Sequence, residues 1–386
     1  MTNQIEQQNS LRAASQSPSS AELSAAELQT KNERIADFLD RKGLAALLLS
    51  RHENIAWVTA GQVEARVALG SETAVASLLL TRDGGRYYIA PNNEGPRLAS
   101  EEFPGLGYEA VLYPWHQSAG PRIQELAAGG AIGSDTAAPG VTDLDLSTLR
   151  APLLPAEIDR FRALGRDTAD ATVEVLEWLK PGVTEHEMAA RTAAALLTRG
   201  ISPTVLLMGT DDRIRKFKHA VPRNGVLDRY GMVNLCARKW GLIVSITRFV
   251  HFGPVPRDHS AFFIDAARIH SELLHATGAG ATAAQIFAAA QKAYTAAGAA
   301  EEIELHHQGG PCGYTARDWV ITPAGQQTVA LPQAFAYNPS LRGAKVEDTV
   351  IVANDSTEVL TGTPSLPILE TTIDQITYRS AGVLVR

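Results

Sequence analysis

The stretch of residues 218–253 constrains the fold most. It contains two apolar runs, residues 226–237 and 241–250, separated by a short Arg-Lys-Trp-Gly turn. Branched apolar residues on both sides of a short turn predict a β-hairpin. His219 stands just before this predicted hairpin. The fold must therefore bring a histidine to the entrance of a two-stranded antiparallel unit.

Composition excludes several classes of protein. The chain has 386 residues, enough for two domains, and its 45% hydrophobic and 20% charged content is that of an ordinary globular protein. A net charge of −7 argues against a nucleic-acid-binding surface. The two cysteines, Cys236 and Cys312, lack a paired spacing, which argues against a zinc ribbon and a disulfide framework.

The first residues, 1–25, are rich in Ser, Gln and Asn, and we expect a flexible tail rather than a signal peptide or an anchor. No run approaches the roughly 20 apolar residues of a membrane span. We therefore expect a cytoplasmic protein that binds neither membrane nor nucleic acid.

The rest of the chain divides into two predicted domains. Within residues 26–153, predicted helices (25–44, 54–61, 94–103, 121–128) alternate with predicted strands (45–49, 73–80, 86–90, 109–112, 131–133). This alternation indicates a small α/β domain. Pro152 and Pro155 mark the boundary, and residues 154–386 form the second predicted domain.

The second domain begins with two predicted helices, residues 156–179 and 185–198, the latter opened by a capping box at Thr184. After the hairpin come two more, residues 256–277 and 281–296. Short strand-like runs broken by Gly and Pro then cover residues 302–360. A helix pair, a hairpin and a repeat of this order suggest an internal pseudo-repeat.

Three pieces of sequence together resemble the creatinase/aminopeptidase P family. They are the E-I-x-R-x-R pattern from Glu157, the following Lys-Pro-Gly-Val-Thr-Glu link, and the Ser-Ile-Thr-Arg run of residues 245–248 in the hairpin. The resemblance covers roughly residues 30–360. It implies an α+β fold, with a C-terminal pita-bread domain preceded by a smaller α/β domain. It also implies a homodimer.

Metal-dependent members of that family hold two ions with two aspartates, a histidine and two glutamates. The matching positions here are Asn234, Ser245, His307, Asn338 and Glu347. Three of the five are neutral groups that cannot replace carboxylates, because divalent ions need hard anionic oxygens. We therefore expect no bound metal and no other cofactor.

Creatinase works without a metal and uses a histidine before the hairpin to move a proton. The resemblance assigns catalytic roles to His219, His307 and Glu347. A neutral histidine can take a proton from water and return it to a leaving nitrogen. The main hypothesis is a metal-independent hydrolase that cleaves a C–N bond of a small nitrogen-containing metabolite. Candidate substrate-binding residues are Arg248, Asn234, Ser245, Asn338 and Tyr314.

Two other functions stay open. One is a metal-dependent Xaa-Pro dipeptidase or aminopeptidase with an unorthodox ligand set, His307 and Glu347 with Asp228 or Asp318. The other is a non-catalytic binding module. Elemental analysis with a chelator assay separates the first of these from the main hypothesis.

Several candidates also have a purely structural interpretation. His306 and His307 are adjacent, so on a strand they point to opposite faces, and we expect only His307 to face the site. Arg248 can form a salt bridge, Asn338-Pro339 a turn, and Glu347 with Asp348 a solvated acidic pair. Cys312 is a weak candidate nucleophile. The basic cluster before His219 (Arg213, Arg215, Lys216, Lys218) is either a solvated face or an attractor for an anionic substrate.

Overall fold

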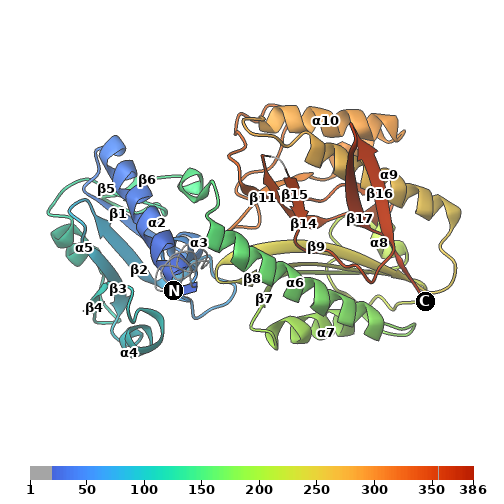
Figure 1. Ribbon diagram of the computed structural model, residues 1–386. Helices are drawn as coiled ribbons and strands as arrows, with labels where there is room; N and C mark the ends of the chain where they lie inside the picture. Colours follow the sequence, from blue (N-terminus) through green and yellow to red (C-terminus); the bar gives the residue numbers. More distant parts are fainter. Residues whose placement is uncertain (1–19, 355) are drawn as a thin grey trace, which may run out of the picture.

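The N-terminal part of the chain forms a six-stranded sheet with helices around it (Figure 1). The computed structural model describes residues 20–354 and 356–386, so most of the predicted tail lies outside the described residues. Helix α2 (Ser20–Lys42) begins before the expected residue 25. The strand order is β4 (Glu109–Tyr113), β3 (Arg86–Pro91), β2 (Thr73–Thr81), β1 (Ala46–Arg51), β5 (Ile132–Ser134), β6 (Thr142–Asp143).

The central strand β1 explains why this sheet needs cover on both faces. Leu47 and Leu49 pack into one apolar cluster, whereas Ala46 and Leu48 pack into another, because successive side chains point to opposite faces. The remaining elements of this part are α3 (His52–Val58), α4 (Gly95–Arg97), the π-helix Leu98–Glu102, α5 (Gly120–Leu126) and the 3-10 helix Ser147–Arg150. The predicted α/β order is thus found, and the domain boundary at residues 153/154 stays a prediction.

The C-terminal part contains two four-stranded sheets with helices outside them (Figure 1). One sheet has the order β18 (Leu384–Val385), β9 (Leu242–His251), β8 (Tyr230–Lys239), β7 (Ser202–Thr210). The other is β10 (Gly309–Cys312), β11 (Gln333–Tyr337), β14 (Asp348–Ala353), β15 (Ser356–Val359). The C-terminal part also contains two separate two-stranded hairpins, β12 (Ser340–Leu341) with β13 (Ala344–Lys345), and β16 (Ile368–Ile373) with β17 (Ile376–Ala381).

Helices α6 (Pro155–Trp178) and α7 (Glu185–Leu197) pack beside the sheet that contains β7, β8 and β9 (Figure 1). Helices α9 (Arg257–His275) and α10 (Ala283–Ala296) lie on the side of the sheet that contains β11 and β14 (Figure 1). The short helix α8 (Asp212–Lys216) lies between β7 and β8, and the 3-10 helix Ala300–Leu305 lies between α10 and β10. The predicted capping box at Thr184 is present. The predicted α+β class is therefore confirmed. None of the helices in the described ranges combines the length and apolar character needed to cross a membrane.

The predicted hairpin is β8 paired with β9, although its first strand starts at Tyr230 rather than at residue 226. The turn requires glycine at position 241, where φ is +77° and an added Cβ would lie 2.3 Å from that of Ala56. Strand β7 was not predicted. It is an edge strand, and Pro203 and Gly209 interrupt the strand pattern within it.

The two C-terminal sheets meet between β9 and the start of β14, where Thr247 bridges Glu347 and its N–H donates to the Glu347 carbonyl oxygen over 3.2 Å. Thr349 adds two bonds across the seam. Its hydroxyl accepts from the Ser245 N–H at 2.7 Å and donates to the Ser245 carbonyl at 2.9 Å. Backbone and side-chain hydrogen bonds at the seam therefore hold the hairpin positions 245 and 247 next to Glu347.

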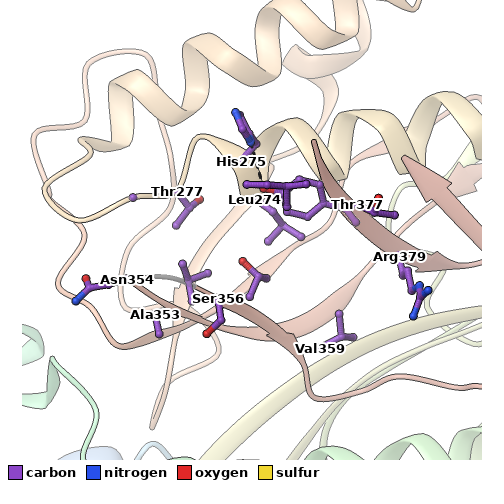
Figure 2. Close-up of a pocket in the computed structure, with 14 residues that line it drawn as sticks. Leu274, His275, Thr277, Ala353, Asn354, Ser356, Val359, Thr377 and Arg379 are labelled. Carbon is purple, nitrogen blue, oxygen red and sulfur yellow. Dashed lines mark hydrogen bonds between the residues drawn. The ribbon is translucent and has the colours of Figure 1, made fainter. Parts of the chain in front are cut away.

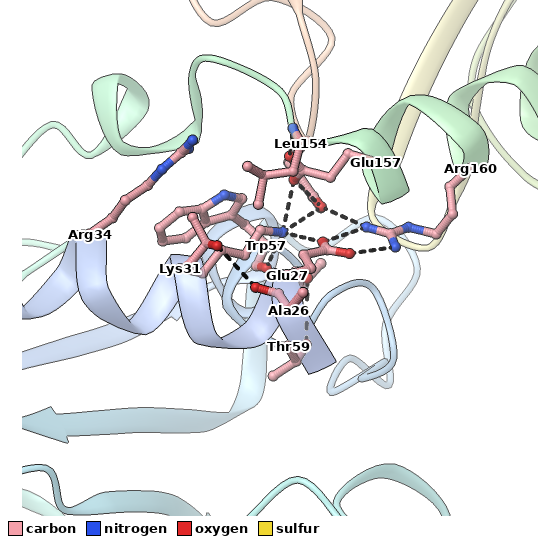
Figure 3. A network of polar contacts seen from close by, with 12 residues as sticks. Ala26, Glu27, Lys31, Arg34, Trp57, Thr59, Leu154, Glu157 and Arg160 are labelled. Atoms are coloured by element: carbon pink, nitrogen blue, oxygen red, sulfur yellow. Dashed lines mark hydrogen bonds and ion pairs between the residues drawn. The ribbon is translucent and has the colours of Figure 1, made fainter. Parts of the chain in front are cut away.

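A buried ionic network joins α2 to α6 (Figure 3). The Lys31 ammonium, which is fully buried, lies 2.6 Å from Glu27 and 2.8 Å from Glu157, and Arg160 also pairs with Glu27. The Tyr314 hydroxyl donates to Glu157 at 2.8 Å and contacts Lys31 at 3.1 Å. The Tyr314 hydroxyl is therefore used inside this network, and the predicted role of Tyr314 in substrate binding stays a prediction.

Candidate active site at the seam of the two sheets

Three histidines lie together beside the seam. The Nε2 atoms of His219 and His306 are 3.0 Å apart, and the ring of His307 lies 4.5 Å from that of His306 and 6.2 Å from that of His219, centroid to centroid. His219 comes from the loop before β8, and the other two come from the segment between the 3-10 helix Ala300–Leu305 and β10. The prediction that only one of the adjacent histidines faces the site is wrong.

The reason is local backbone structure. His306 and His307 precede β10, which begins at Gly309, so the alternation of a strand does not apply to them. Gly309 has φ +92°, and an added Cβ would lie 2.1 Å from the Ala336 carbonyl oxygen. Only glycine allows the chain to enter the sheet directly after the histidines.

All three imidazoles favour the neutral form. Partial burial and the charge of Lys345 lower the pKa of His306 to about 3. Partial burial and the charge of Arg317 lower the pKa of His307 to about 4. The pKa of His219 is lowered for the same kind of reason, through partial burial and Lys345, with Glu347 opposing. At neutral pH these rings can accept a proton or a hydrogen bond.

Glu347 lies at the centre of a buried polar cluster. The Lys345 ammonium is 2.9 Å from Oε2, and the Arg317 guanidinium is 3.2 Å from Oε1. Asn234 Nδ2 donates to Oε2 at 2.7 Å, and the Thr247 hydroxyl donates to the same atom at 2.6 Å. Both carboxylate oxygens are thus occupied by groups of the chain itself. Burial alone would raise the pKa of Glu347, but Lys345 and Arg317 lower it to about 2.

The other predicted site positions surround this cluster. Lys345 donates to Asn234 Oδ1 at 3.3 Å, and Arg317 donates to the Ser245 hydroxyl at 3.2 Å. Asn234, Ser245 and Asn338 are all buried, and the Asn338 Oδ1 atom has no hydrogen-bond partner. The structure therefore brings Asn234 and Ser245 to Glu347, where they contact protein cations. Asn338 alone keeps a free side-chain acceptor among these three.

The Arg248 side chain, a predicted substrate-binding group, has partners within the chain for its N–H groups, and its role at a substrate stays a prediction. Its Nε donates to Thr363, its Nη1 to the carbonyls of Thr247 and Glu347, and its Nη2 to Asp348 and the Thr361 carbonyl. All five N–H donors are used, and the side chain is only 2% exposed. The alternative interpretation as a salt bridge is the one observed, and Asp348 is buried with Arg248 rather than solvated.

Cys312 is also unsuited to catalysis, because it is buried and burial raises the pKa of its thiol to about 12. The basic cluster before His219 is mostly paired within the chain. Arg213 pairs with Glu185, Lys218 with Glu302, and Lys216 with Asp212. These pairs leave little positive charge there for an anionic substrate.

Lys345 and Arg317 are the functional residues that sequence reasoning missed. They lie two and thirty positions from Glu347 in the chain, and only folding brings both to its carboxylate. One signal was present in the sequence. A buried glutamate that has lost its metal partners needs cations elsewhere, because an unpaired buried charge is costly.

Two cavities of several hundred Å³ are not lined by any of the three histidines. One, of about 640 Å³, is lined by the end of α9, β14–β15 and β17 (Figure 2). There the His275 Nδ1 atom lies 3.2 Å from the Tyr378 hydroxyl. The other, of about 700 Å³, lies beside Arg248 and Asp348. Their lining includes none of the three histidines and neither Lys345 nor Arg317.

The comparisons with known proteins identify the family. Residues 159–354, about half of the chain, match the sequence profile of metallopeptidase family M24. The chain belongs to family M24. The resemblance seen in the sequence is therefore confirmed, and the predicted hydrolase class agrees with this family of hydrolases.

The chain is similar to a protein named probable dipeptidase PepE from Mycobacterium tuberculosis, at 28% identity over 230 residues. That match covers 54% of this chain and 58% of the relative, so it spans little more than half of the relative's length. The fold matches that of dipeptidase PepE from Mycobacterium ulcerans, with a TM-score of 0.72, 20% identity, and 88% and 96% of the two chains covered. It also matches Xaa-Pro dipeptidase from Bacillus anthracis, with a TM-score of 0.74, 16% identity, and 93% and 100% covered.

The metal centre implied by the M24 name does not fit the side chains present. Glu347, the one carboxylate left at the family's ligand positions, is held by two cations, and Asn234 and Ser245 are neutral. Within the described ranges, the group with metal-ligand spacing is His219, His306 and His307, whose ligand atoms lie within 4.8 Å of one another. Among the described residues, this group includes neither Asp228 nor Asp318. Asp318 instead pairs with Arg150.

Proposed function

We propose that this M24 protein is a hydrolase that cleaves a C–N bond of a small peptide-like substrate, with a neutral histidine as the proton-transfer group. The proposal includes a catalytic site that works without the family's two-metal centre. The observation that carries it is the group of three neutral histidines beside the Lys345–Glu347–Arg317 cluster.

The similarity to proteins named as dipeptidases favours a peptide-like substrate over the unspecified nitrogen-containing metabolite of our main hypothesis. This similarity thereby favours the substrate class of the alternative hypothesis, a peptide. The side chains at the site favour the metal-free chemistry of the main hypothesis. We therefore combine a peptide-like substrate with metal-free chemistry, and separate experiments test the substrate and the chemistry.

The histidine pair suggests how the proton moves. When the Nε2–H of His219 donates to the Nε2 atom of His306, the Nδ1 atom of His219 carries the free lone pair. His219 then takes a proton from water as the water oxygen attacks the carbonyl carbon. The C–N bond breaks, and the imidazolium returns the proton to the leaving nitrogen. Such proton transfer contributes about 10²–10⁴-fold in rate.

The test starts with the purified full chain, dialysed against a chelator. We would offer dipeptides, N-acylated amino acids and creatine and measure the release of amine or urea. Turnover of a peptide-like substrate that persists without metal is expected. His219→Ala should lower kcat by about 10²-fold or more with a small change in KM. His116→Ala, an exposed histidine of the N-terminal part, is the control.

Three results would count against the proposal. A fully active His219→Ala variant would remove the role of this histidine. Activity that appears only with added metal would remove the metal-free mechanism. No turnover of any peptide-like substrate would favour the binding-module interpretation.

A further inference from the structure

The three histidines beside the seam carry nitrogen atoms with the spacing of a metal site. One ligand nitrogen from each of His219, His306 and His307 lies within 4.8 Å of the others. We propose that these three side chains bind one divalent transition-metal ion of the zinc type, and that the bound ion stops catalysis by occupying His219. The effect on turnover rests on the proposed function, whereas the binding of the ion does not.

The positions of the nitrogen atoms fit a single ion. Nitrogen ligands lie about 2.0–2.1 Å from zinc, so two ligands of one tetrahedral ion are about 3.4 Å apart. The Nε2 atoms of His219 and His306 are 3.0 Å apart. The His307 ring is exposed, so it can rotate toward the other two and complete the set. The fourth position then stays open to water, as in zinc sites with three protein ligands.

Contacts outside the rings hold the ligand-bearing segments side by side. The Lys218 ammonium lies 2.7 Å from the Glu302 carboxylate. This ion pair joins the residue before His219 to the 3-10 helix before His306. The buried Gln308 amide donates to the His306 carbonyl oxygen at 2.6 Å. Segments that are already fixed lose less conformational freedom when their side chains bind an ion.

The donor set differs from the two-ion centre of the family, because it contains nitrogen alone and no carboxylate. Imidazole suits zinc, copper and nickel, whereas magnesium, calcium and manganese prefer oxygen ligands. Partial burial lowers the pKa of all three rings, so protons do not compete with the ion at neutral pH. The positive charges of Lys345 and Arg317 act on the rings and weaken cation binding, and Glu347 partly offsets them.

A bound ion and proton transfer cannot share His219. A neutral imidazole has one nitrogen with a free lone pair, and its other nitrogen carries the proton. When the ion takes the lone pair of His219, neither nitrogen can accept a proton from water. The proton transfer that contributes about 10²–10⁴-fold in rate is then lost. Saturating zinc should therefore lower turnover by about 10²-fold or more.

Calorimetry with zinc chloride on the full chain, dialysed against a chelator, tests binding separately from turnover. Wild type should bind one ion per chain. His306→Ala and His307→Ala should each lower the affinity by at least roughly 100-fold, the largest usual loss when a group that only supports a ligand is removed. His116→Ala, an exposed histidine of the N-terminal part, is the control and should bind zinc as wild type does. Circular dichroism would establish that each variant is folded.

Turnover provides the second readout. Zinc should inhibit wild type, and the residual turnover of His307→Ala should resist zinc. Wild type that binds no zinc would overturn the inference, whether or not the variants fold. So would zinc binding that survives in both His306→Ala and His307→Ala, or zinc that raises turnover. Zinc binding through the histidines without turnover of any peptide-like substrate would support the metal site and refute the proposed function.

Discussion

Replacing Glu347 by glutamine should make the protein's stability less dependent on pH. The pKa of this carboxyl falls from its ordinary 4.5 to about 2 in the folded chain, because Lys345 and Arg317 outweigh the effect of burial. At about 1.4 kcal/mol for each tenfold change in proton affinity, this difference corresponds to about 3 kcal/mol of unfolding free energy. Glutamine keeps the shape of the side chain and removes its charge.

The lowered pKa of Glu347 determines how its contribution to stability changes with pH. A group whose pKa falls on folding stabilises the protein above its unfolded-state value, here 4.5. That stabilisation is lost as the pH falls from 4.5 towards 2. Urea unfolding of wild type and Glu347→Gln, followed by circular dichroism at pH 6 and pH 3, would measure it. About 2 kcal/mol of the difference between the two proteins should disappear over this interval.

Glu358→Gln is the control, because Glu358 forms a half-exposed ion pair with Arg162 at 2.8 Å. Such pairs contribute only about 0–1 kcal/mol. A difference between wild type and Glu347→Gln that stays constant from pH 6 to pH 3 would refute the reasoning. It would mean that Lys345 and Arg317 do not hold the carboxylate ionised.

Three further predictions follow from other parts of the molecule. Lys31→Met should lower the unfolding free energy by about 3–5 kcal/mol, because it leaves buried Glu27 and Glu157 without their shared cation; Lys42→Met, exposed on the same helix, should have little effect in the same urea assay. The acid limb of kcat/KM should lie below pH 6.5, because the pKa of His219 is lowered and its neutral form is the base; a limb above 7 would contradict this. Light scattering should find a homodimer, and a monomer at micromolar concentration would contradict that expectation.

The sequence predicted the elements whose patterns are local. The hairpin, the capping box at Thr184 and most helices and strands were placed within a few residues, because periodicity and turn chemistry set them. The sequence pattern does not predict strand β7, because Pro203 and Gly209 interrupt the alternation of apolar residues. The expectation that His306 and His307 point to opposite faces fails because both residues precede β10, so the alternation of a strand does not apply to them.

The site was harder to predict than the fold. The sequence shows that carboxylates are missing at positions 234, 245 and 338. It does not show that Lys345 and Arg317 pair with Glu347 in place of metal ions. Arg317 reaches Glu347 only through the loop after β10. The sequence suggests Arg248 and Tyr314 as binding residues because both lie near motifs. Burial and existing partners, which decide whether a polar group is free, depend on packing between distant segments.

We infer that Lys345 and Arg317 stand in place of metal ions at Glu347. Metal content measured after equilibration with Mn²⁺, Co²⁺ or Zn²⁺ and removal of free ions tests it most directly, for wild type and for Glu347→Gln. We expect fewer than two ions per chain, with the same value in both proteins. Two ions per chain in wild type that are lost in Glu347→Gln would contradict it.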